Sequence, residues 1–367
     1  MKSQSLLNSF KEIKKTINEN DYKKPFIVCR TFITKSFIME FIDSLGIEYI
    51  TYTAFTPNPK YEEVVKGIKK YLDGNCDFII SIGGGSAIDV AKCINLFLPL
   101  DQSKNYLEQK YNKCKTKHLA IPTTAGTGSE STKYAVIYYN DVKQSITEES
   151  IIPEFVILEP SFLETVPDYQ KKSTLLDALC QGIESYWSIN STEESKKYAK
   201  ESINLIMSNY EAYIKNIDHD INSKIMFAAN LSGKAINITQ TTSAHAMSYK
   251  ITSLYEISHG HAVALVLPYI WEYMINNIDK CEDKRGKEYL NNIFTEINNM
   301  FECNTSKESI EKFKKIYKYM SLSNPWLSNE EELVALTNSV NEKRLKNNPV
   351  SLNKETILKI YKEALAK

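Results

Sequence analysis

Several features that mark particular classes of protein are scarce or missing in this chain of 367 residues. Its seven cysteines are scattered without a CxxC pair, so the sequence predicts neither a disulfide framework nor a zinc knuckle. Lys and Arg, 45 together, balance 45 Asp and Glu, which leaves no basic character for binding nucleic acid or a membrane surface. No run reaches the ~18 apolar residues of a membrane span, and the first residues carry no signal-peptide pattern. We therefore expect a reduced, cytoplasmic protein with no nucleic-acid or membrane partner.

Length and composition are those of a globular protein with two domains. A hydrophobic content of 43% with 25% charged residues is typical of such proteins, and 367 residues exceed one ordinary domain. In the first half, helical patterns alternate with short apolar runs at 25–30, 47–55, 77–84, 118–124, 134–140 and 155–160. This alternation predicts a doubly wound, parallel α/β domain over residues 1–168. From 169 to 367 helical patterns follow one another, which predicts an all-α domain.

A glycine turn joins one predicted strand to a helix in "FIISIGGGSAIDVAK" (78–92). Gly83, Gly84 and Gly85 allow the backbone to approach a diphosphate closely, and a helix beginning near Ser86, the expected N-cap, directs its free N–H groups at it. The pattern is neither GxGxxG nor a Walker P-loop. A second polar loop, "IPTTAGTGSEST" (121–132), also follows a strand, so the two loops would bracket a nucleotide at one sheet edge. A glycine turn of this kind is also common for purely structural reasons.

Histidine is scarce in this chain, and its distribution is uneven. Three of only five histidines fall within residues 243–262. His245 and His259 lie fourteen residues apart with a probable helix break between them, while Asp177 and Gln181 share one helix face at a spacing of four. An aspartate in so apolar a turn is costly to bury unless a cation or donor compensates it. One carboxylate with two imidazoles suits Zn²⁺ or Fe²⁺. Helix caps or hydrogen-bonded core histidines are the alternative interpretation, which we prefer for His261.

Four motifs in order, "GGGSAIDVAK", "IPTTAGTGSE", "DALCQGIESYWS" and "HAMSYKITSLYEISHGHAVALVLP", resemble the iron-containing (group III) alcohol dehydrogenase family. The similarity extends over essentially the whole chain. It implies the dehydroquinate-synthase-like architecture of that family: an N-terminal dinucleotide-binding domain, a helical C-terminal domain, and a divalent metal with a nicotinamide cofactor. The implied reaction is reversible hydride transfer between the nicotinamide and a metal-polarised aldehyde.

The family's metal is held by an aspartate and three histidines, which the resemblance carries to Asp177, His245 and His259. At the fourth position this chain has Gln181, a neutral and weaker ligand than imidazole. A further family histidine is replaced by Tyr249, a candidate proton relay or an aromatic packing partner of the nicotinamide.

The cofactor expected is NADPH, with NADH possible. Arg30 ends the first strand where NAD-preferring relatives commonly carry an aspartate, and an arginine there can pair with a 2′-phosphate. A solvated surface arginine is the alternative. The complete set of candidate cofactor-binding residues is Arg30, Gly84, Gly85, Ser86, Asp89, Thr123, Thr124, Thr127, Ser129 and Thr132.

Lysines near the expected active site suggest an anionic aldehyde. Lys234 stands eleven residues before His245 where the family usually has apolar residues, and we take it as a candidate active-site residue; Lys133 follows the second loop. The segments 143–160 and 245–265 are similar to phosphonoacetaldehyde reductases, which make 2-hydroxyethylphosphonate. A neutral short aldehyde of the lactaldehyde, butyraldehyde or 3-hydroxypropionaldehyde type is the alternative, since lysines on solvated helix faces are common. A dehydroquinate-synthase-like lyase and a non-catalytic binder are weaker alternatives. Homodimers are common in the family and possible here.

Overall fold

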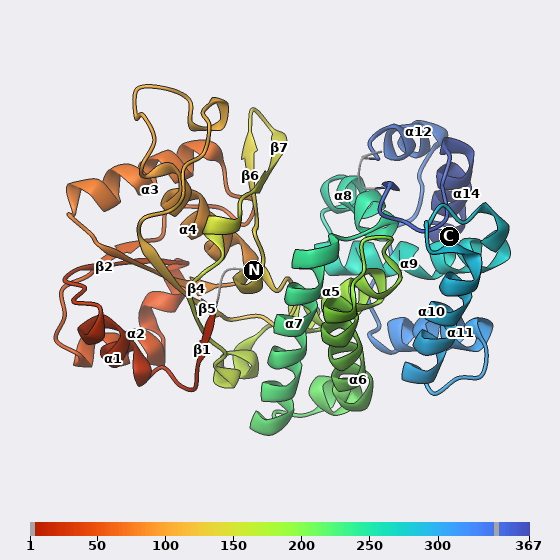
Figure 1. The fold of residues 1–367 in the computed structure, drawn as a ribbon, viewed down its shortest axis with the longest axis horizontal. Coiled ribbons are helices and arrows are strands. Elements are labelled where there is room, and N and C mark those ends of the chain that lie inside the picture. Colours follow the sequence, from red (N-terminus) through yellow and green to blue (C-terminus); the bar gives the residue numbers. More distant parts are fainter. Residues whose placement is uncertain (1–3, 341–344) are drawn as a thin grey trace. The chain divides into compact units, whose positions relative to one another are not determined.

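The computed structural model describes residues 4–340 and 345–367 (Figure 1). The chain separates into two compact units, Met1–Leu163 and Glu164–Lys367. The first contains the strands and the second is helical, which confirms the predicted fold class. The division lies a few residues before the boundary at 168 that the sequence suggested.

The first unit is built on a six-stranded sheet with the order β1-β8-β5-β4-β2-β3, and every neighbouring pair is parallel. Its strands are β1 (Ser5–Leu7), β2 (Pro25–Cys29), β3 (Ile50–Tyr52), β4 (Phe78–Gly83), β5 (Lys117–Pro122) and β8 (Phe155–Ile157). The connecting helices are α1 (Glu12–Glu19), α2 (Phe37–Ser44), α3 (Tyr61–Asp73) and α4 (Gly85–Phe97). The strand order reverses between β2 and β4, and ligands of open α/β sheets bind at the carboxyl ends of strands at such a point.

Both faces of this sheet are buried, which explains the continuous apolar runs of its central strands. Successive residues of β2 alternate between two clusters: Phe26 and Val28 pack with α3 and α4, whereas Ile27 and Cys29 pack with α1 and α2. The helices therefore cover both faces, as the doubly wound prediction requires (Figure 1).

The predicted strand at 134–140 exists but lies outside the parallel sheet. It is β6 (Tyr134–Tyr139), paired antiparallel with β7 (Val142–Thr147), a strand that the apolar runs did not reveal. The two-residue connection, Asn140 and Asp141, has φ of 49° and 57°. Two left-handed residues in a row form the tight turn that matches the twist of a hairpin, and Asn and Asp tolerate it well.

The described part of the second unit is built of helices. They are α5 (Asp168–Trp187), α6 (Glu193–Lys215), α7 (His219–Thr239), α8 (Ser243–Tyr255), α9 (His259–Asn276), α10 (Gly286–Met300), α11 (Ser306–Tyr319), α12 (Glu330–Asn338) and α14 (Lys354–Ala364). Within the described residues, no helix is long and apolar enough to cross a membrane. Helix α5 is buried along most of its length, so side chains on several of its faces meet other helices.

Candidate metal and nucleotide sites

The glycine turn lies between β4 and α4, as predicted, but the helix begins two residues earlier than an N-cap at Ser86 would place it. Gly84, in an extended conformation, is the N-cap, so the prediction of Ser86 as the cap is wrong. Ser86 is the second helical residue, and its hydroxyl donates to the Pro57 carbonyl oxygen. The backbone N–H groups of the first turn of α4 therefore remain the natural donors for an anion.

The second loop lies directly beside this turn. A methyl group added at Gly84 would stand 3.3 Å from Thr124 Oγ1, and one at Gly85 would stand 3.1 Å from Thr127 Oγ1. The Thr123 amide donates to the Gly83 carbonyl oxygen at 3.1 Å. Two threonine hydroxyls thus flank a backbone surface that only glycine leaves open.

Three other predicted cofactor residues take part in a network around Lys92, a fully buried lysine of α4 that the sequence did not single out. Its ammonium donates to the carbonyl oxygens of Ser129, Thr132 and Tyr134 at 2.5–2.8 Å. Asp89 accepts from the Ser129 hydroxyl at 2.6 Å. Burial lowers the pKa of Lys92 to about 8, with Asp89 opposing that shift. Asp89, Ser129 and Thr132 therefore fasten the second loop to α4.

Arg30 follows β2, at the end of the sheet where the glycine turn follows β4. Its Nη1 donates to the Phe55 carbonyl oxygen at 2.7 Å, and its guanidinium stands 5.8 Å from the centre of the Phe55 ring. This bond uses one of the five guanidinium N–H groups of Arg30, and the guanidinium lies beside the aromatic ring of Phe55. Arg30 is thus placed at the strand end by contacts of its own.

In the second unit, Asp177, His245 and His259 converge. Each offers a ligand atom, and these atoms all lie within 4.8 Å of one another. Asp177 comes from the middle of α5, His245 from the first turn of α8, and His259 from the first residue of α9. The helix break predicted between the two histidines is confirmed, since α8 ends before Glu256, whose φ of 53° is left-handed. The loop after it brings the second imidazole back to the first.

The chemistry of this group matches a cation. His245 Nε2 and Asp177 Oδ1 are 3.4 Å apart, both side chains are buried, and neither atom has a hydrogen-bond partner among the described residues. Unpaired buried polar atoms are costly, and a divalent ion between them would satisfy both.

Glu184 lies about two turns after Asp177 on the same face of α5, and it organises this group. Its side chain is fully buried. Oε1 accepts the backbone N–H groups of Thr242, Ala244 and His245 at the start of α8, together with the Thr242 hydroxyl. Oε2 accepts from His245 Nδ1. A proton on Nδ1 leaves the lone pair of Nε2 for a metal, an arrangement common to histidine ligands.

The protonation state of the group reflects these neighbours. Burial opposes a charged His245, but Glu184 and Asp177 outweigh it and raise the pKa of His245 to about 9. At neutral pH a cation that binds Nε2 therefore replaces the proton on that nitrogen. For Asp177, burial acts to raise the pKa, and its neighbours His245, His259 and Gln181 outweigh burial so that the pKa lies below its usual value. The carboxylate is therefore ionised and ready to bind a cation.

His259 is oriented by Ser248 and Tyr249. The Ser248 hydroxyl donates to the His245 carbonyl oxygen at 2.9 Å and lies 3.3 Å from His259 Nδ1. Since that hydroxyl has one proton, it accepts from Nδ1–H, which leaves Nε2 of His259 as the ligand atom. The Tyr249 ring is parallel to the His259 ring within 4°, with centroids 5.5 Å apart. Tyr249 thus lies against the metal group.

Gly260 permits the close approach of α9 to α5. A Cβ at this position would stand 2.1 Å from the Ser173 carbonyl oxygen and 2.6 Å from Asp177 Cβ. Only glycine fits without moving the helices apart, and the residue directly before it is the candidate ligand His259.

Gln181 lies one turn along α5 from Asp177 and is buried. Its Oε1 stands 2.9 Å from the hydroxyl of Ser232 on α7, and its amide contributes a hydrogen bond to Asp177. Gln181 is thus brought into contact with the metal group.

Lys234, a predicted active-site residue, and His261 make contacts of their own. Lys234 follows Ser232 by two positions, about 200° around α7, and its ammonium stands 6.0 Å from the centre of the Tyr198 ring. His261 is fully buried, with Nδ1 3.1 Å from the Tyr169 hydroxyl and Nε2 3.4 Å from Asn324 Oδ1. His261 does not belong to the cluster of potential ligands formed by Asp177, His245 and His259.

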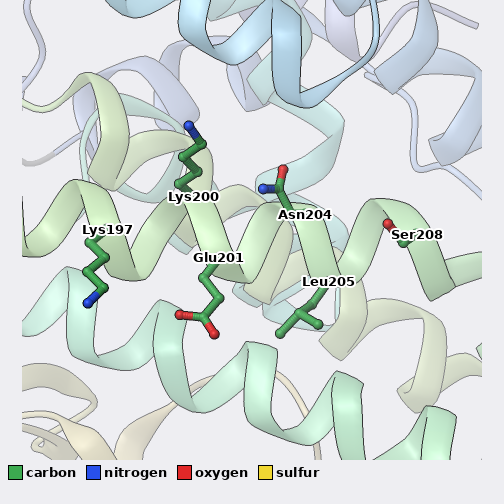
Figure 2. A pocket seen from close by; sticks show the side chains of 6 residues that line it. All are labelled: Lys197, Lys200, Glu201, Asn204, Leu205 and Ser208. Atoms are coloured by element: carbon green, nitrogen blue, oxygen red, sulfur yellow. The ribbon is translucent and has the colours of Figure 1, made fainter.

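A shallow surface hollow of about 410 Å³ lies elsewhere in this unit, along α6 (Figure 2). Figure 2 shows Lys197, Glu201 and Leu205 on the side of α6 that faces a neighbouring helix, with Lys200 and Asn204 pointing away from it. Its lining residues all come from one helix and include no member of the metal group, so we assign it no ligand.

Comparison with known proteins agrees with this geometry. The model of the iron-containing alcohol dehydrogenase family matches residues 7–160, and that of the C-terminal part of Fe-containing alcohol dehydrogenases matches residues 171–365. An alcohol dehydrogenase of Thermococcus barophilus is 28% identical over 343 residues, 89% of this chain and 87% of its own. An NADPH-dependent butanol dehydrogenase of Clostridium saccharobutylicum is 28% identical over 316 residues, 83% of this chain and 72% of its own.

Among solved structures, a sulfoacetaldehyde reductase from Bifidobacterium kashiwanohense in complex with NAD⁺ superposes with a TM-score of 0.89 at 22% identity, covering 100% of this chain and 97% of that one. This likeness concerns the fold. The chain belongs to the iron-containing alcohol dehydrogenase family, and it is an oxidoreductase of the alcohol dehydrogenase class.

Gly260 yields a direct test of how the metal group is assembled. Gly260→Ala should separate α9 from α5, displace His259 from Asp177 and weaken metal binding at least about tenfold, the lower end of the loss seen when the support of a ligand is disturbed. Metal affinity would be measured by competition with a chromogenic chelator.

The matched control is Gly182→Ala on α5, where the added methyl would meet the Ile203 side chain at 3.0 Å and the Ala199 carbonyl oxygen at an ordinary contact distance of 3.6 Å. Unchanged metal affinity in Gly260→Ala, with a folded protein, would contradict the proposed packing constraint.

Proposed function

We propose that this protein catalyses the metal-dependent, NAD(P)H-linked reduction of a small aldehyde to a primary alcohol, and its reverse. The observation that carries the proposal is the convergence of one carboxylate and two imidazoles, since the ligand atoms of Asp177, His245 and His259 all lie within 4.8 Å of one another. One carboxylate and two imidazoles suit Fe²⁺ or Zn²⁺. When bound, such a metal supplies Lewis-acid polarisation of a carbonyl oxygen, and a reduced nicotinamide supplies hydride.

The protein's own residues take distinct parts in this proposal. Asp177, His245 and His259 hold the metal, with Gln181 as a fourth, neutral ligand. Tyr249 relays a proton to the product oxygen; its support is the parallel stacking of its ring on His259.

The nucleotide is held, in this proposal, by the two loops at the carboxyl ends of β4 and β5. The backbone N–H groups in the first turn of α4 and the hydroxyls of Thr124 and Thr127 donate hydrogen bonds to the diphosphate. Asp89, Ser129 and Thr132 contribute by fixing the second loop through Lys92. Arg30 pairs with a 2′-phosphate, which makes NADPH the preferred cofactor and NADH the poorer one.

For the aldehyde itself we propose phosphonoacetaldehyde, reduced to 2-hydroxyethylphosphonate, on the resemblance of segments 143–160 and 245–265 to phosphonoacetaldehyde reductases. A structural neighbour named as a sulfoacetaldehyde reductase supports an anionic two-carbon substrate by analogy of fold. A neutral short aldehyde is the second candidate. It is favoured by the partners that two of the lysines already have, since Lys133 pairs with Glu149 at 3.1 Å and Lys234 lies against Tyr198.

Substrate preference decides between these candidates. With metal-reconstituted protein and NADPH, phosphonoacetaldehyde should give a kcat/KM at least about tenfold above propionaldehyde and lactaldehyde, equivalent to ~1.4 kcal/mol in the transition state. Lys234→Ala should reduce that advantage, whereas Lys224→Ala, a lysine on the same helix paired with Asp220, should preserve it.

Equal or better use of the neutral aldehydes would establish the second candidate and leave Lys234 without a substrate role. Turnover of a phosphorylated substrate without net NADPH consumption would instead indicate a lyase, and absence of turnover in metal-loaded protein would indicate a non-catalytic binder.

Cofactor preference tests Arg30 separately. Arg30→Asp should lower the ratio of kcat/KM with NADPH to that with NADH by about tenfold or more, because a carboxylate repels a 2′-phosphate and accepts from a 2′-hydroxyl. Lys35→Asp, which makes the same change of charge at a nearby exposed lysine, is the control. A ratio that does not move would remove Arg30 from the cofactor site.

A further inference from the structure

Gln181 stands where a metal ligand of the family is expected, and the structure places Ser232 of α7 in contact with its amide. Ser232 Oγ lies 2.9 Å from Gln181 Oε1 and 2.8 Å from the Ala229 carbonyl oxygen one turn back on α7. The Ser232 side chain is fully buried. Both contacts are within hydrogen-bond distance, yet a hydroxyl has only one proton to donate.

The two contacts cannot both be donated at once, so they define two arrangements of the amide. In the first, the hydroxyl donates to Gln181 Oε1, and the amide nitrogen is directed at Asp177. In the second, the Gln181 amide is turned over, its nitrogen donates to Ser232 Oγ, and the hydroxyl donates to the Ala229 carbonyl oxygen. Because a hydroxyl both donates and accepts, Ser232 satisfies either arrangement without moving.

The charge at Asp177 determines which arrangement is stable. Without a cation, the ionised carboxylate attracts the amide N–H groups and repels the amide oxygen, which favours the first arrangement. A divalent cation held by Asp177, His245 and His259 reverses this preference, since a cation attracts the carbonyl oxygen and repels the N–H groups. A histidine at position 181 would not require this rotation, because it has no amide whose oxygen and nitrogen must exchange places.

We propose that Ser232 is a positioning residue for Gln181: its hydroxyl accepts from the turned amide and so holds Oε1 toward the metal as the fourth ligand. This inference rests on the proposed function, because it requires a metal at the Asp177–His245–His259 group. It explains how a neutral amide serves in place of imidazole, since a supporting hydrogen bond fixes the orientation that ligation needs.

A double-mutant cycle on metal affinity tests this role without relying on turnover. Zn²⁺ affinity would be measured by chelator competition in the wild type, Ser232→Ala, Gln181→Ala and the double variant, and the absorption spectrum of the Co²⁺-loaded protein would report a change in ligand set. Ser232→Ala should weaken Zn²⁺ binding about tenfold, as the loss of such supporting hydrogen bonds does. In the Gln181→Ala background it should have an effect of less than about threefold, because no amide remains to be positioned.

The control is Ser202→Ala, a fully buried serine of α6 that donates to the Ala228 carbonyl oxygen at 2.8 Å and should leave Zn²⁺ affinity unchanged. An equal loss from Ser232→Ala in both backgrounds, or no loss in either, would overturn the positioning role while leaving the metal site in place. A wild-type protein that binds no metal would overturn the proposed function together with this inference.

Discussion

The buried carboxylate of Glu184 is the interaction on which the candidate metal site depends. Removing a charge from water is expensive unless donors replace the lost hydration. Here three backbone N–H groups at the start of α8, the Thr242 hydroxyl and the His245 ring all donate to it. Those amides are ones that no helical carbonyl can satisfy, so the same contact caps α8 and stabilises the charge. Because it also fixes His245, the position of a ligand is tied to the stability of a helix.

Close approach of backbone is the second constraint, and it acts at both candidate sites. Gly260 brings α9 against α5, while Gly84 and Gly85 leave the glycine turn open beside Thr124 and Thr127. In each case a methyl group would occupy the space on which the arrangement relies. Of the 12 glycines in the chain, the ones that these two arrangements require therefore lie next to the candidate ligand His259 or in the glycine turn before α4.

The parts of this picture that the sequence predicts are those encoded locally or in the family motifs. Alternating apolar runs predict the doubly wound sheet, and the strand–glycine–helix pattern predicts the turn before α4. The spacing of Asp177 and Gln181 suggests a shared helix face, but their meeting with His245 and His259 is implied by resemblance. The β6–β7 hairpin was missed because its signal is the pair Asn140 and Asp141 rather than a run of apolar residues.

Glu184, Ser232 and Lys92 were missed for a different reason. Each is an ordinary polar residue in a helical pattern, and its role exists only through contacts with residues from 37 to 61 positions away. Glu184 had one available signal, since it lies seven residues after Asp177 and three after Gln181 and hence on the same face of α5. The residue pattern along one helix, however, does not reveal which residues of other helices pack against that face.

Locating the metal is the measurement that tests the account most directly. Crystals of the protein loaded with Zn²⁺ or Fe²⁺, with data collected on either side of the absorption edge of the metal, would give an anomalous difference map. The account predicts one strong peak in contact with Asp177 Oδ1, His245 Nε2 and His259 Nε2. A metal found elsewhere on the chain, or none at this group in fully loaded protein, would contradict it.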